Sequence, residues 1–318
     1  MQVFQGFQSI PDDGRGSVVA LGNFDGVHHG HRHVIALASG LAETLDAPLG
    51  VALFDPHPRR FFAPDAPAFR LMGEHRRNRT LESLGVERLH ILPFTADMAA
   101  MTPEQFVADV LDEGLGIKGV VTGSDFRFGA GRAGTIGELE RLCAARGIKT
   151  AFADLHGNGA DKVSSTRIRK AILDGDMKAA AELMGTPWAI EGIVQKGDQR
   201  GRTIGFPTAN IDLGDFVRPA YGVYAVRVGL PGQDAAVDAV ANFGKRPTVD
   251  GLSELLEVHL FDFAGDLYGQ ALEVEFQAFI RPERKFDGLD ALKAQIAEDA
   301  AQARRLLAAP SGPSTGPA

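Results

Sequence analysis

Hydrophobic and polar positions divide the chain into two halves with different periodicities. In the first half, short apolar runs alternate with segments in which apolar residues recur every three to four positions, as on one face of a helix. This alternation predicts an α/β region with a parallel sheet covered by helices. The predicted strands are 18–22, 49–54, 88–92, 119–122 and 150–153, and the predicted helices are 29–45, 74–84, 103–112 and 137–146.

The second half changes character after two short predicted helices, at 165–175 and 176–184. Apolar and polar residues alternate in LEVHLFDF and LEVEFQAF, which is typical of half-buried antiparallel strands. A helix follows at 288–307, with Leu289, Leu292, Ile296 and Leu306 among its apolar positions, and we expect it to pack as a cover. The predicted strands of this all-β region are 189–195, 222–228, 235–242, 254–261 and 271–278.

These patterns predict two domains, at 1–185 and 186–308. The last ten residues, APSGPSTGPA, contain little that could join a core, and we expect 309–318 to be disordered.

Composition places the chain among ordinary globular proteins. Of its 318 residues, 44% are hydrophobic and 23% are charged, and the net charge of -8 argues against a broad nucleic-acid-binding surface. No apolar run reaches the ~18 residues that a membrane span needs, and the first residues lack the pattern of a secretory signal. The single cysteine, Cys143, excludes an intrachain disulfide and is expected to be a buried, inert thiol. We therefore expect a cytoplasmic protein that binds neither membranes nor nucleic acid.

The segment GNFDGVHHGH joins the first predicted strand to the first predicted helix. Its glycines allow a tight turn and close approach of the backbone to a ligand. The start of a helix offers unpaired N–H groups and the positive end of the helix dipole, which together favour an anion. His28 and His31 are three residues apart and can share one face of the first turn, so this segment predicts a phosphate site.

A metal site is the alternative for these histidines. His29 and His33 have the i,i+4 spacing found in some zinc sites. A catalytic zinc ion usually has three protein ligands, however, and no second ligand cluster is evident nearby. We therefore favour phosphate for His28 and His31, and expect His29 and His33 to be exposed helix residues.

GNFDGVHHGH resembles the nucleotide-binding signature of the HxGH nucleotidyltransferase superfamily and, more narrowly, that of the bacterial FAD synthetases, which are bifunctional riboflavin kinase/FMN adenylyltransferases. The resemblance implies a Rossmann-like HxGH nucleotidyltransferase domain, then a six-stranded antiparallel β-barrel kinase domain with a C-terminal helix. It also implies ATP, riboflavin and FMN as substrates, and Mg²⁺. The other motifs that carry it occur in the family's order: FDPHP, GSDFRFGAGRAG and SSTRIRKAILDGD in the first half, then GDQRGRTIGFPTANI, YGVYAV, NFGKRPTVDG, LEVHLFDFAGDLYG and FIRPERKFDGLDALKAQI.

In the first domain, the resemblance implies transfer of AMP from ATP to FMN. His28 and His31 would bind the ATP phosphates, and His57 would help to hold the phosphate of FMN. Phe126 and Phe128 would flank the isoalloxazine ring, although simple core packing would explain both phenylalanines equally well. The remaining residues expected at this site are Gly22, Asn23, Phe24, Asp25, Gly30, Asp125 and Arg127.

A second helix start, SSTRIR, is also expected to contact the triphosphate. Its hydroxyl groups and arginines suit an anion, although ordinary helix capping with solvated arginines is the alternative. The residues concerned are Ser164, Ser165, Thr166, Arg167 and Arg169.

In the second domain, the resemblance implies phosphorylation of riboflavin. Glu257 matches the catalytic glutamate, although alternation alone would make it a solvent-facing strand residue, since Leu256 and Val258 form the other face. Thr208 and Asn210 offer the hard oxygen ligands that Mg²⁺ prefers. Gly197, Gly205 and Pro207 would bring the backbone close to the ATP phosphates, and Arg281 and Phe286 would line the riboflavin site.

Two other kinds of function remain possible from the sequence. One is a flavin or nucleotide sensor that has lost catalysis, against which the intact His28, His31, Asn210 and Glu257 argue. The other is an adenylyltransferase for a different substrate with an added β-domain, against which the ordered kinase motifs argue. The sequence GTPWAI departs from the family pattern at Thr186, while Trp188 remains a packing aromatic.

Overall fold

The computed structural model describes residues 1–154, 163–196, 205–233, 235–248 and 251–308. Their side chains are described as well, except within 246–253. The chain packs as two compact units, which are described separately below. The first consists of Met1–Ala66 and Glu74–Val163, and the second of Pro67–Gly73 and Ser164–Ala318. By packing, the two short helices before residue 185 group with the second unit, because α8 (Met177–Met184) contacts strand β12 (Ala271–Pro282). The domain boundary at residue 185 stays a prediction.

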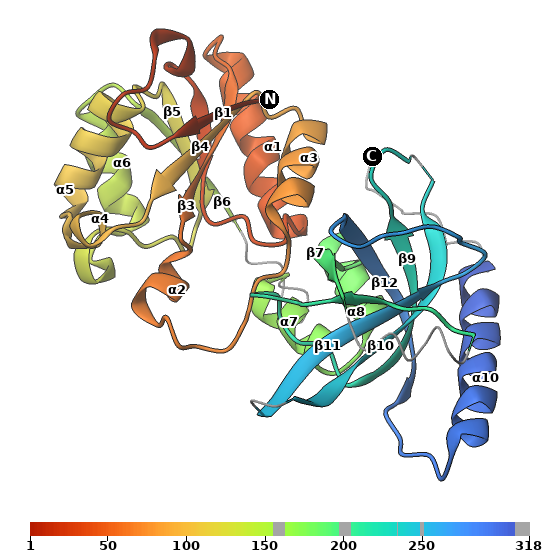
Figure 1. Cartoon of the computed structure of the whole chain (residues 1–318). Helices are drawn as coiled ribbons and strands as arrows, with labels where there is room; N and C mark the ends of the chain where they lie inside the picture. Colours follow the sequence, from red (N-terminus) through yellow and green to blue (C-terminus); the bar gives the residue numbers. More distant parts are fainter. Residues whose placement is uncertain (155–162, 197–204, 234, 249–250, 309–318) are drawn as a thin grey trace. The chain divides into compact units, whose positions relative to one another are not determined.

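The first unit contains a six-stranded parallel sheet in the order β1-β4-β3-β2-β5-β6 (Figure 1). Each strand expected from an apolar run is present, and the chain leaves the central β2 first toward β3 and later toward β5. Ligands bind at such a reversal, beyond the carboxyl ends of the strands. The strands are β1 (Gln2–Gln5), β2 (Val18–Leu21), β3 (Leu49–Asp55), β4 (Arg88–Pro93), β5 (Gly119–Gly123) and β6 (Lys149–Ala153).

Helices cover both faces of this sheet. Helix α1 packs across β2, β3, β5 and β6 through Val34, Ile35, Ala38 and Ala42. The other face buries Val19, Leu21 and Val120 against the π-helix η2 and helix α6. The helical elements are η1 (Asp12–Gly14), α1 (His29–Thr44), α2 (Pro58–Phe62), α3 (Glu74–Ser83), α4 (Ala96–Ala100), α5 (Pro103–Gln105), η2 (Phe106–Gly114), η3 (Ala130–Arg132) and α6 (Ile136–Ala144).

Cys143 is fully buried in the core beside α6, as expected. Burial raises the pKa of its thiol to about 12, so the reactive thiolate is absent at neutral pH.

The second unit contains a closed antiparallel barrel in the order β10-β11-β8-β7-β12-β9, which confirms the expected six strands. Buried residues at alternate positions, including Leu256 and Val258 on β11, fill its interior. Trp188 is fully buried and donates from Nε1 to the carbonyl of Leu71, so its packing role is confirmed. The elements are α7 (Ser165–Leu173), α8, β7 (Ala189–Gln195), β8 (Ala209–Ile211), β9 (Gly222–Gly229), β10 (Val237–Thr248), β11 (Gly251–Leu260), β12 and α10 (Leu289–Ala308).

Helix α10 lies against the outside of the barrel, beside β9, β10 and β12 (Figure 1). It is a cover, but the apolar positions expected to make the contact are partly wrong, because Leu289 and Leu306 are exposed. Ala303 and Leu307 are buried there instead, together with the carboxylate of Asp299. The expected disordered tail, 309–318, lies outside the described residues. Among the helices that the structure describes, none is both long and apolar enough to cross a bilayer.

Candidate active sites

The turn between β2 and α1 holds an unusual backbone conformation. Phe24 and Val27 have φ angles of 51° and 36°, in the left-handed region that most side chains avoid. This conformation is least favourable for a β-branched residue such as Val27. Phe24 is fully buried, so its ring anchors the turn in the core. Strain of this kind collects at functional sites, where the surrounding structure holds it in place.

His28 and His31 are stacked on each other at the start of α1. Their ring centroids are 3.7 Å apart and the rings are inclined by 14°. His28 is the N-cap residue, because its Nδ1 accepts from the backbone N–H of His31 at 3.4 Å. In the neutral imidazole this leaves the proton of His28 on Nε2. A Cβ at Gly30 would lie 3.2 Å from the His28 ring, so any larger residue there would push this ring by a few tenths of an ångström. His29 and His33 are exposed on the same helix.

A cavity of about 780 Å³ opens at the carboxyl ends of the parallel strands, beside this turn. Four residues at or just after the carboxyl ends of strands line it: Asn23 after β2, Phe54 on β3, Phe94 after β4 and Gly123 on β5. This end of the sheet is where an α/β fold binds its ligand. His28 stands behind His31 and does not line the cavity, and neither do Asp25 and Gly30. The expected residues that do line it are Gly22, Asn23, Phe24, His31, His57, Asp125, Phe126, Arg127 and Phe128.

Aromatic rings line this cavity in one connected row, because Phe106 contacts both Phe54 and Phe128. Phe126 and Phe128 are stacked with centroids 5.9 Å apart, and Phe128 is buried in the core beside Phe106. Phe62 is 68% exposed and, with Phe54, packs edge-on against Phe94. Sequence reasoning did not place Phe54, Phe62 or Phe94 at this site.

Polar groups reach the cavity from several loops. His57 caps the short helix α2 by accepting from the N–H of Arg59 at 3.0 Å, and both residues line the cavity. Arg127, in the loop after β5, and Arg132, the last residue of η3, line the cavity as well. The Oδ1 atom of Asn23 is buried and has no hydrogen-bond partner among the described residues, so it can accept from a ligand.

The expected second helix start is helix α7, which belongs to the second unit. Ser164 caps it by accepting from the N–H of Arg167 at 3.4 Å. Arg169 donates from Nε to the carbonyl of Phe69 at 2.7 Å. The phosphate roles of Ser164, Ser165, Thr166, Arg167 and Arg169 stay predictions.

In the second unit, a row of polar residues crosses four neighbouring strands of the barrel. Asn242 on β10 is paired with Glu257 on β11, Glu257 with Asn210 on β8, and Asn210 with Gln195 on β7. Asn210 is only 5% exposed, and its Oδ1 has no hydrogen-bond partner within the described part of the chain.

A second cavity, of about 370 Å³, lies between the outer face of the barrel and α10. Glu257 lines it from β11, Arg281 from β12, and Leu292 and Ile296 from α10. Alternation therefore assigned Glu257 to the correct face, since Leu256 and Val258 point into the barrel. The expected residues that line this cavity are Thr208, Glu257, Arg281 and Phe286, and those that sequence reasoning missed include Phe206, Asn242, His259, Glu283 and Asp299.

Thr208 lies between this cavity and a smaller hollow of about 70 Å³, because it lines both. Pro207 lines the small hollow, and its carbonyl oxygen is 2.8 Å from Nδ1 of His259. Since a carbonyl can only accept, Nδ1 of His259 carries the proton. Gly205 has a φ angle of +87° and is exposed. Gly197 lies outside the described residues.

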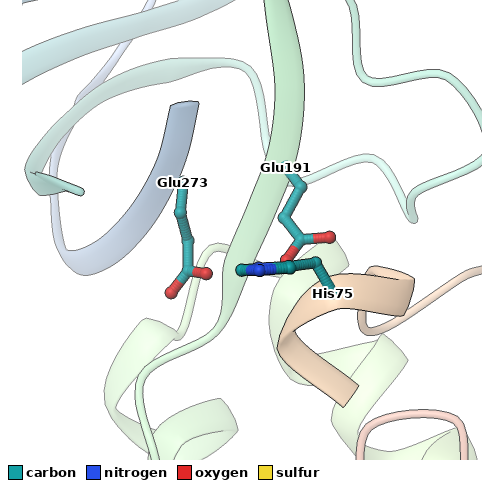
Figure 2. A group of neighbouring side chains, drawn as sticks. All are labelled: His75, Glu191 and Glu273. Atoms are coloured by element: carbon teal, nitrogen blue, oxygen red, sulfur yellow. The ribbon is translucent and has the colours of Figure 1, made fainter. Parts of the chain in front are cut away.

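Two further pairs of ionisable residues, Tyr221 with Glu254 and Glu191 with Glu273, belong to the barrel and do not line these cavities. Tyr221 donates to Glu254, and burial together with this hydrogen bond raises the pKa of Tyr221 to about 12. Burial acts to raise the pKa of Glu254, but the hydrogen bonds from Tyr221 and Arg218 outweigh it and hold that pKa below its usual range. Glu191 on β7 and Glu273 on β12 are paired in register (Figure 2), and sequence reasoning did not single them out. His75, also drawn in Figure 2, belongs to the first unit.

Comparison with known proteins agrees with this division of sites. A family model described as FAD synthetase matches residues 10–167, and one described as riboflavin kinase matches residues 184–307. The bifunctional riboflavin kinase/FMN adenylyltransferase of Escherichia coli K12 is 43% identical over 296 residues, which cover 92% of this chain and 93% of that protein. The chain belongs to this family. Its members from Haemophilus influenzae and Bacillus subtilis are 40% and 38% identical, over 96% and 93% of this chain.

Membership of the bifunctional riboflavin kinase/FMN adenylyltransferases confirms the resemblance seen in the motifs. The fold is shared with a crystal structure described as a macrolide-efflux protein from Streptococcus pneumoniae. That structure has a TM-score of 0.84 and 34% sequence identity, and the match covers 95% of this chain and 98% of that one.

Proposed function

We propose that the chain phosphorylates riboflavin to FMN in its second unit and transfers AMP from ATP to FMN in its first, giving FAD and pyrophosphate. The observation that carries this proposal is that each unit has its own cavity, lined by residues of the corresponding family motif. The reactants are small molecules. With one buried cysteine and these substrates, we place the protein in the cytoplasm.

In the first unit, a phosphate oxygen of FMN attacks the α-phosphorus of ATP, and the bond to the pyrophosphate oxygen breaks. No covalent enzyme intermediate is needed, so the protein acts by positioning the reactants and stabilising charge. The stacked His28 and His31 stand where the helix dipole favours an anion, and His31 faces the cavity. We assign the pair to the ATP phosphates, with His31 as the ring that contacts them and His28 orienting it through the stacking.

The aromatic rings of the same cavity suit the isoalloxazine ring of FMN. Phe54, Phe62, Phe94, Phe126 and Phe128 all line it. A flat aromatic ligand gains from offset or edge-on contacts with such rings. Arg59, Arg127 and Arg132 supply the positive charge that a mononucleotide phosphate requires.

In the second unit, the 5′-hydroxyl of riboflavin attacks the γ-phosphorus of ATP, and ADP leaves. Glu257 lines the larger cavity and accepts the hydroxyl proton as general base. The flavin ring occupies the apolar space between Phe286, Leu292 and Ile296. Thr208 lines both the flavin cavity and the small hollow beside it. The phosphates of ATP therefore reach Thr208 from the small hollow, on the side opposite the flavin.

Mg²⁺ fits the residues of this second site. The buried Oδ1 of Asn210 has no partner among the residues described, and it lies two positions from Thr208 and opposite Glu257. An amide oxygen and a hydroxyl oxygen are ligands that Mg²⁺ accepts, and we assign both to it. When bound, the ion neutralises charge on the ATP phosphates during transfer.

Chromatography of flavins tests the proposal. Purified full-length protein is mixed with riboflavin, ATP and Mg²⁺, and in a second tube with FMN, ATP and Mg²⁺. We expect FMN followed by FAD in the first tube, and FAD in the second. Absence of FAD from the second tube contradicts the role of the first unit, and absence of FMN from the first contradicts that of the second.

A further inference from the structure

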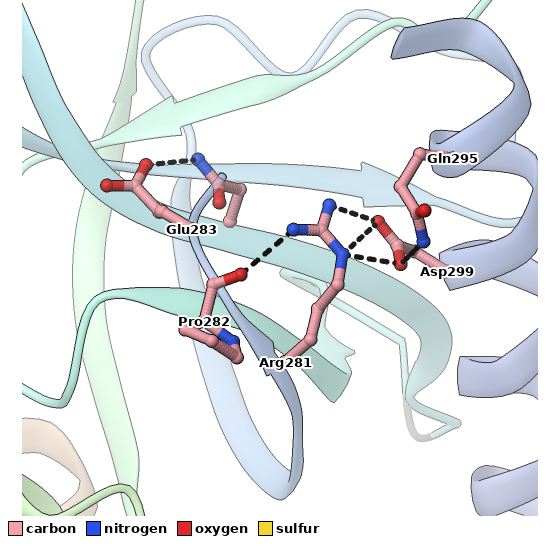
Figure 3. A network of polar contacts seen from close by, with 6 residues as sticks. Arg281, Pro282, Glu283, Gln295 and Asp299 are labelled. Atoms are coloured by element: carbon pink, nitrogen blue, oxygen red, sulfur yellow. Dashed lines mark hydrogen bonds and ion pairs between the residues drawn. The ribbon is translucent and has the colours of Figure 1, made fainter. Parts of the chain in front are cut away.

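One ion pair joins helix α10 to the wall of the kinase cavity. Arg281 on β12 donates from Nε and Nη2 to Asp299 on α10, at 2.9 Å to Oδ1 and 2.7 Å to Oδ2 (Figure 3). Asp299 is only 4% exposed, and both residues line the cavity. A two-pronged contact of this kind fixes the plane of the guanidinium as well as its distance. The position of Arg281 is therefore determined by a residue of α10.

Two further hydrogen bonds complete the geometry. Gln295, one turn earlier on α10, donates from Nε2 to Oδ1 of Asp299 at 2.8 Å. Arg281 donates from Nη1 to the carbonyl of Pro282 at 2.9 Å. Figure 3 shows the carboxylate of Asp299 between Gln295 and Arg281. Because most donors of Arg281 are already satisfied by protein, Arg281 is poorly suited to bind a substrate anion.

What Arg281 does contact is an aromatic ring of the cavity. Its guanidinium carbon lies 5.7 Å from the centroid of Phe286, and that of Arg284 lies 4.9 Å from the same ring. The loop that carries Phe286 has a second attachment, because Asn242 donates to Glu283 at 3.4 Å. The ring of Phe286 thus lies beside a guanidinium that Asp299 fixes, while Arg284 contacts the same ring independently.

We propose that Asp299 is a positioning residue for the flavin substrate of the kinase. It holds Arg281 against Phe286, so that the aromatic wall of the cavity is formed before riboflavin binds. A preformed wall lowers the cost of binding, because no side chain has to be ordered at that moment. This inference rests on the proposed binding of riboflavin in this cavity.

The chain offers a matched control on the same helix. Arg304 of α10 donates to Asp262 at 2.7 and 3.0 Å, which also ties the helix to the barrel. Those side chains are 50% and 78% exposed and do not line the cavity. Asp262→Asn therefore weakens the attachment of α10 without touching the cavity wall, whereas Asp299→Asn affects both.

Steady-state kinase assays on the full-length variants test the proposal. We expect Asp299→Asn to raise the KM for riboflavin roughly tenfold, as for loss of a buried charge-assisted hydrogen bond. The KM for ATP should change less than about twofold. The visible absorption change of riboflavin on binding, which reports ring stacking, should shrink in Asp299→Asn. Asp262→Asn should leave all three quantities unchanged.

Three results would overturn the inference. One is an equal effect of the two substitutions, which would mean that α10 attachment alone matters. Another is a lower kcat with an unchanged KM for riboflavin. The third is an unchanged absorption spectrum of bound riboflavin in Asp299→Asn. If Asp299→Asn does not fold, Gln295→Leu carries the test, with an expected rise of about threefold in the KM for riboflavin; no rise would contradict the inference.

A failure of the underlying function looks different. If wild-type protein makes no FMN, or if Glu257→Gln retains kinase activity, the assignment of the cavity itself is wrong. If wild-type protein makes FMN and Glu257→Gln does not, a normal KM in Asp299→Asn refutes only the role of Asp299.

Discussion

Glu257 and Asn210 lie directly opposite each other on the neighbouring antiparallel strands β11 and β8. Side chains paired in this way have Cβ atoms about 5 Å apart. The proposed general base and the proposed Mg²⁺ ligand are therefore neighbours, although 46 positions separate them in the printed sequence. A hydroxyl group that approaches the metal-bound phosphate would meet the carboxylate at the same place.

Replacing Glu257 by Gln should abolish the kinase and spare the adenylyltransferase. The amide keeps the shape of the side chain but cannot accept the proton, which should cost ~10²–10⁴-fold in kcat. The rates of FMN formation from riboflavin and of FAD formation from supplied FMN measure the two activities. Glu273→Gln, on the same barrel and outside the cavity, is the control. Equal loss of both activities in Glu257→Gln would contradict the two-site arrangement.

His31→Ala should have the opposite effect. Removing the ring that faces the first cavity should lower the rate of FAD formation by about 10²-fold, as for loss of one preorganised donor to a developing charge. The kinase rate should not change. His33→Ala, on the exposed side of the same helix, is the matched control and should behave as wild type in both assays. Unchanged FAD formation in His31→Ala would refute its assignment to phosphate.

Asn210→Leu should make the kinase insensitive to added Mg²⁺. Leucine has a similar size but offers no oxygen ligand, so the kinase rate should fall and should not recover at high Mg²⁺. Titration of the rate with MgCl₂ from micromolar to tens of millimolar measures this. The adenylyltransferase rate of the same sample shows that the protein is intact. A normal Mg²⁺ titration in Asn210→Leu would exclude this residue as a ligand.

Sequence patterns predicted the strands of both units well where burial produced a long apolar run. They missed β1, an edge strand of four residues whose sequence QVFQ holds only two apolar residues, and β8, which is three residues long and follows Gly205 and Pro207. Alternation placed Glu257 on the outer face correctly. Alternation could not show that α10 covers that face of the barrel, because the packing of a helix depends on contacts distant in sequence.

The aromatic row of the first cavity shows what pattern reasoning could have found. Phe54 stands near the end of β3 and Phe94 directly after β4, and parallel strands bring their carboxyl ends to one edge. Applying that rule to every predicted strand would have placed both rings beside the histidine turn. Phe62 could not have been found in this way, because its position depends on the short helix α2.

His90 should make the first unit sensitive to mild acid. It is fully buried beside Phe4, and neither ring nitrogen has a hydrogen-bond partner in the described part of the protein. Burial, aided by the charge of Arg88, lowers the pKa of His90 from 6.5 to about 4. Between these values the unfolded chain binds a proton that the folded chain does not. The unfolding free energy should therefore fall by up to ~3 kcal/mol as the pH drops from above 6.5 to 4.

Hydrogen exchange of peptides from β1 and β4 measures this loss, at pH values from 7.5 to 4.5 with rates corrected for intrinsic exchange. His90→Phe, which keeps a ring beside Phe4, should flatten the pH dependence in those peptides. Peptides of the barrel should respond equally in both proteins and provide the control. A pH dependence that is identical with and without His90 would rule out this residue as its source.

Cys143 should not react with thiol reagents in the folded protein. Its side chain is fully buried and the pKa of its thiol is raised to about 12, so a maleimide added at pH 7.5 should label the native chain far more slowly than the chain unfolded in guanidinium chloride. Mass spectrometry of both samples measures the labelling. Rapid labelling of the native protein would show that the core beside α6 opens.

The burial of Trp188 has a spectroscopic consequence. Trp188 is the single tryptophan of the chain, and the three tyrosines, Tyr221, Tyr224 and Tyr268, lie in the same unit. Ultraviolet fluorescence excited above the phenylalanine band therefore originates from the barrel unit alone. Emission from Trp188 follows the unfolding of the kinase half without interference, while the adenylyltransferase half contributes no signal. The native protein is in this sense labelled on one half by its own composition.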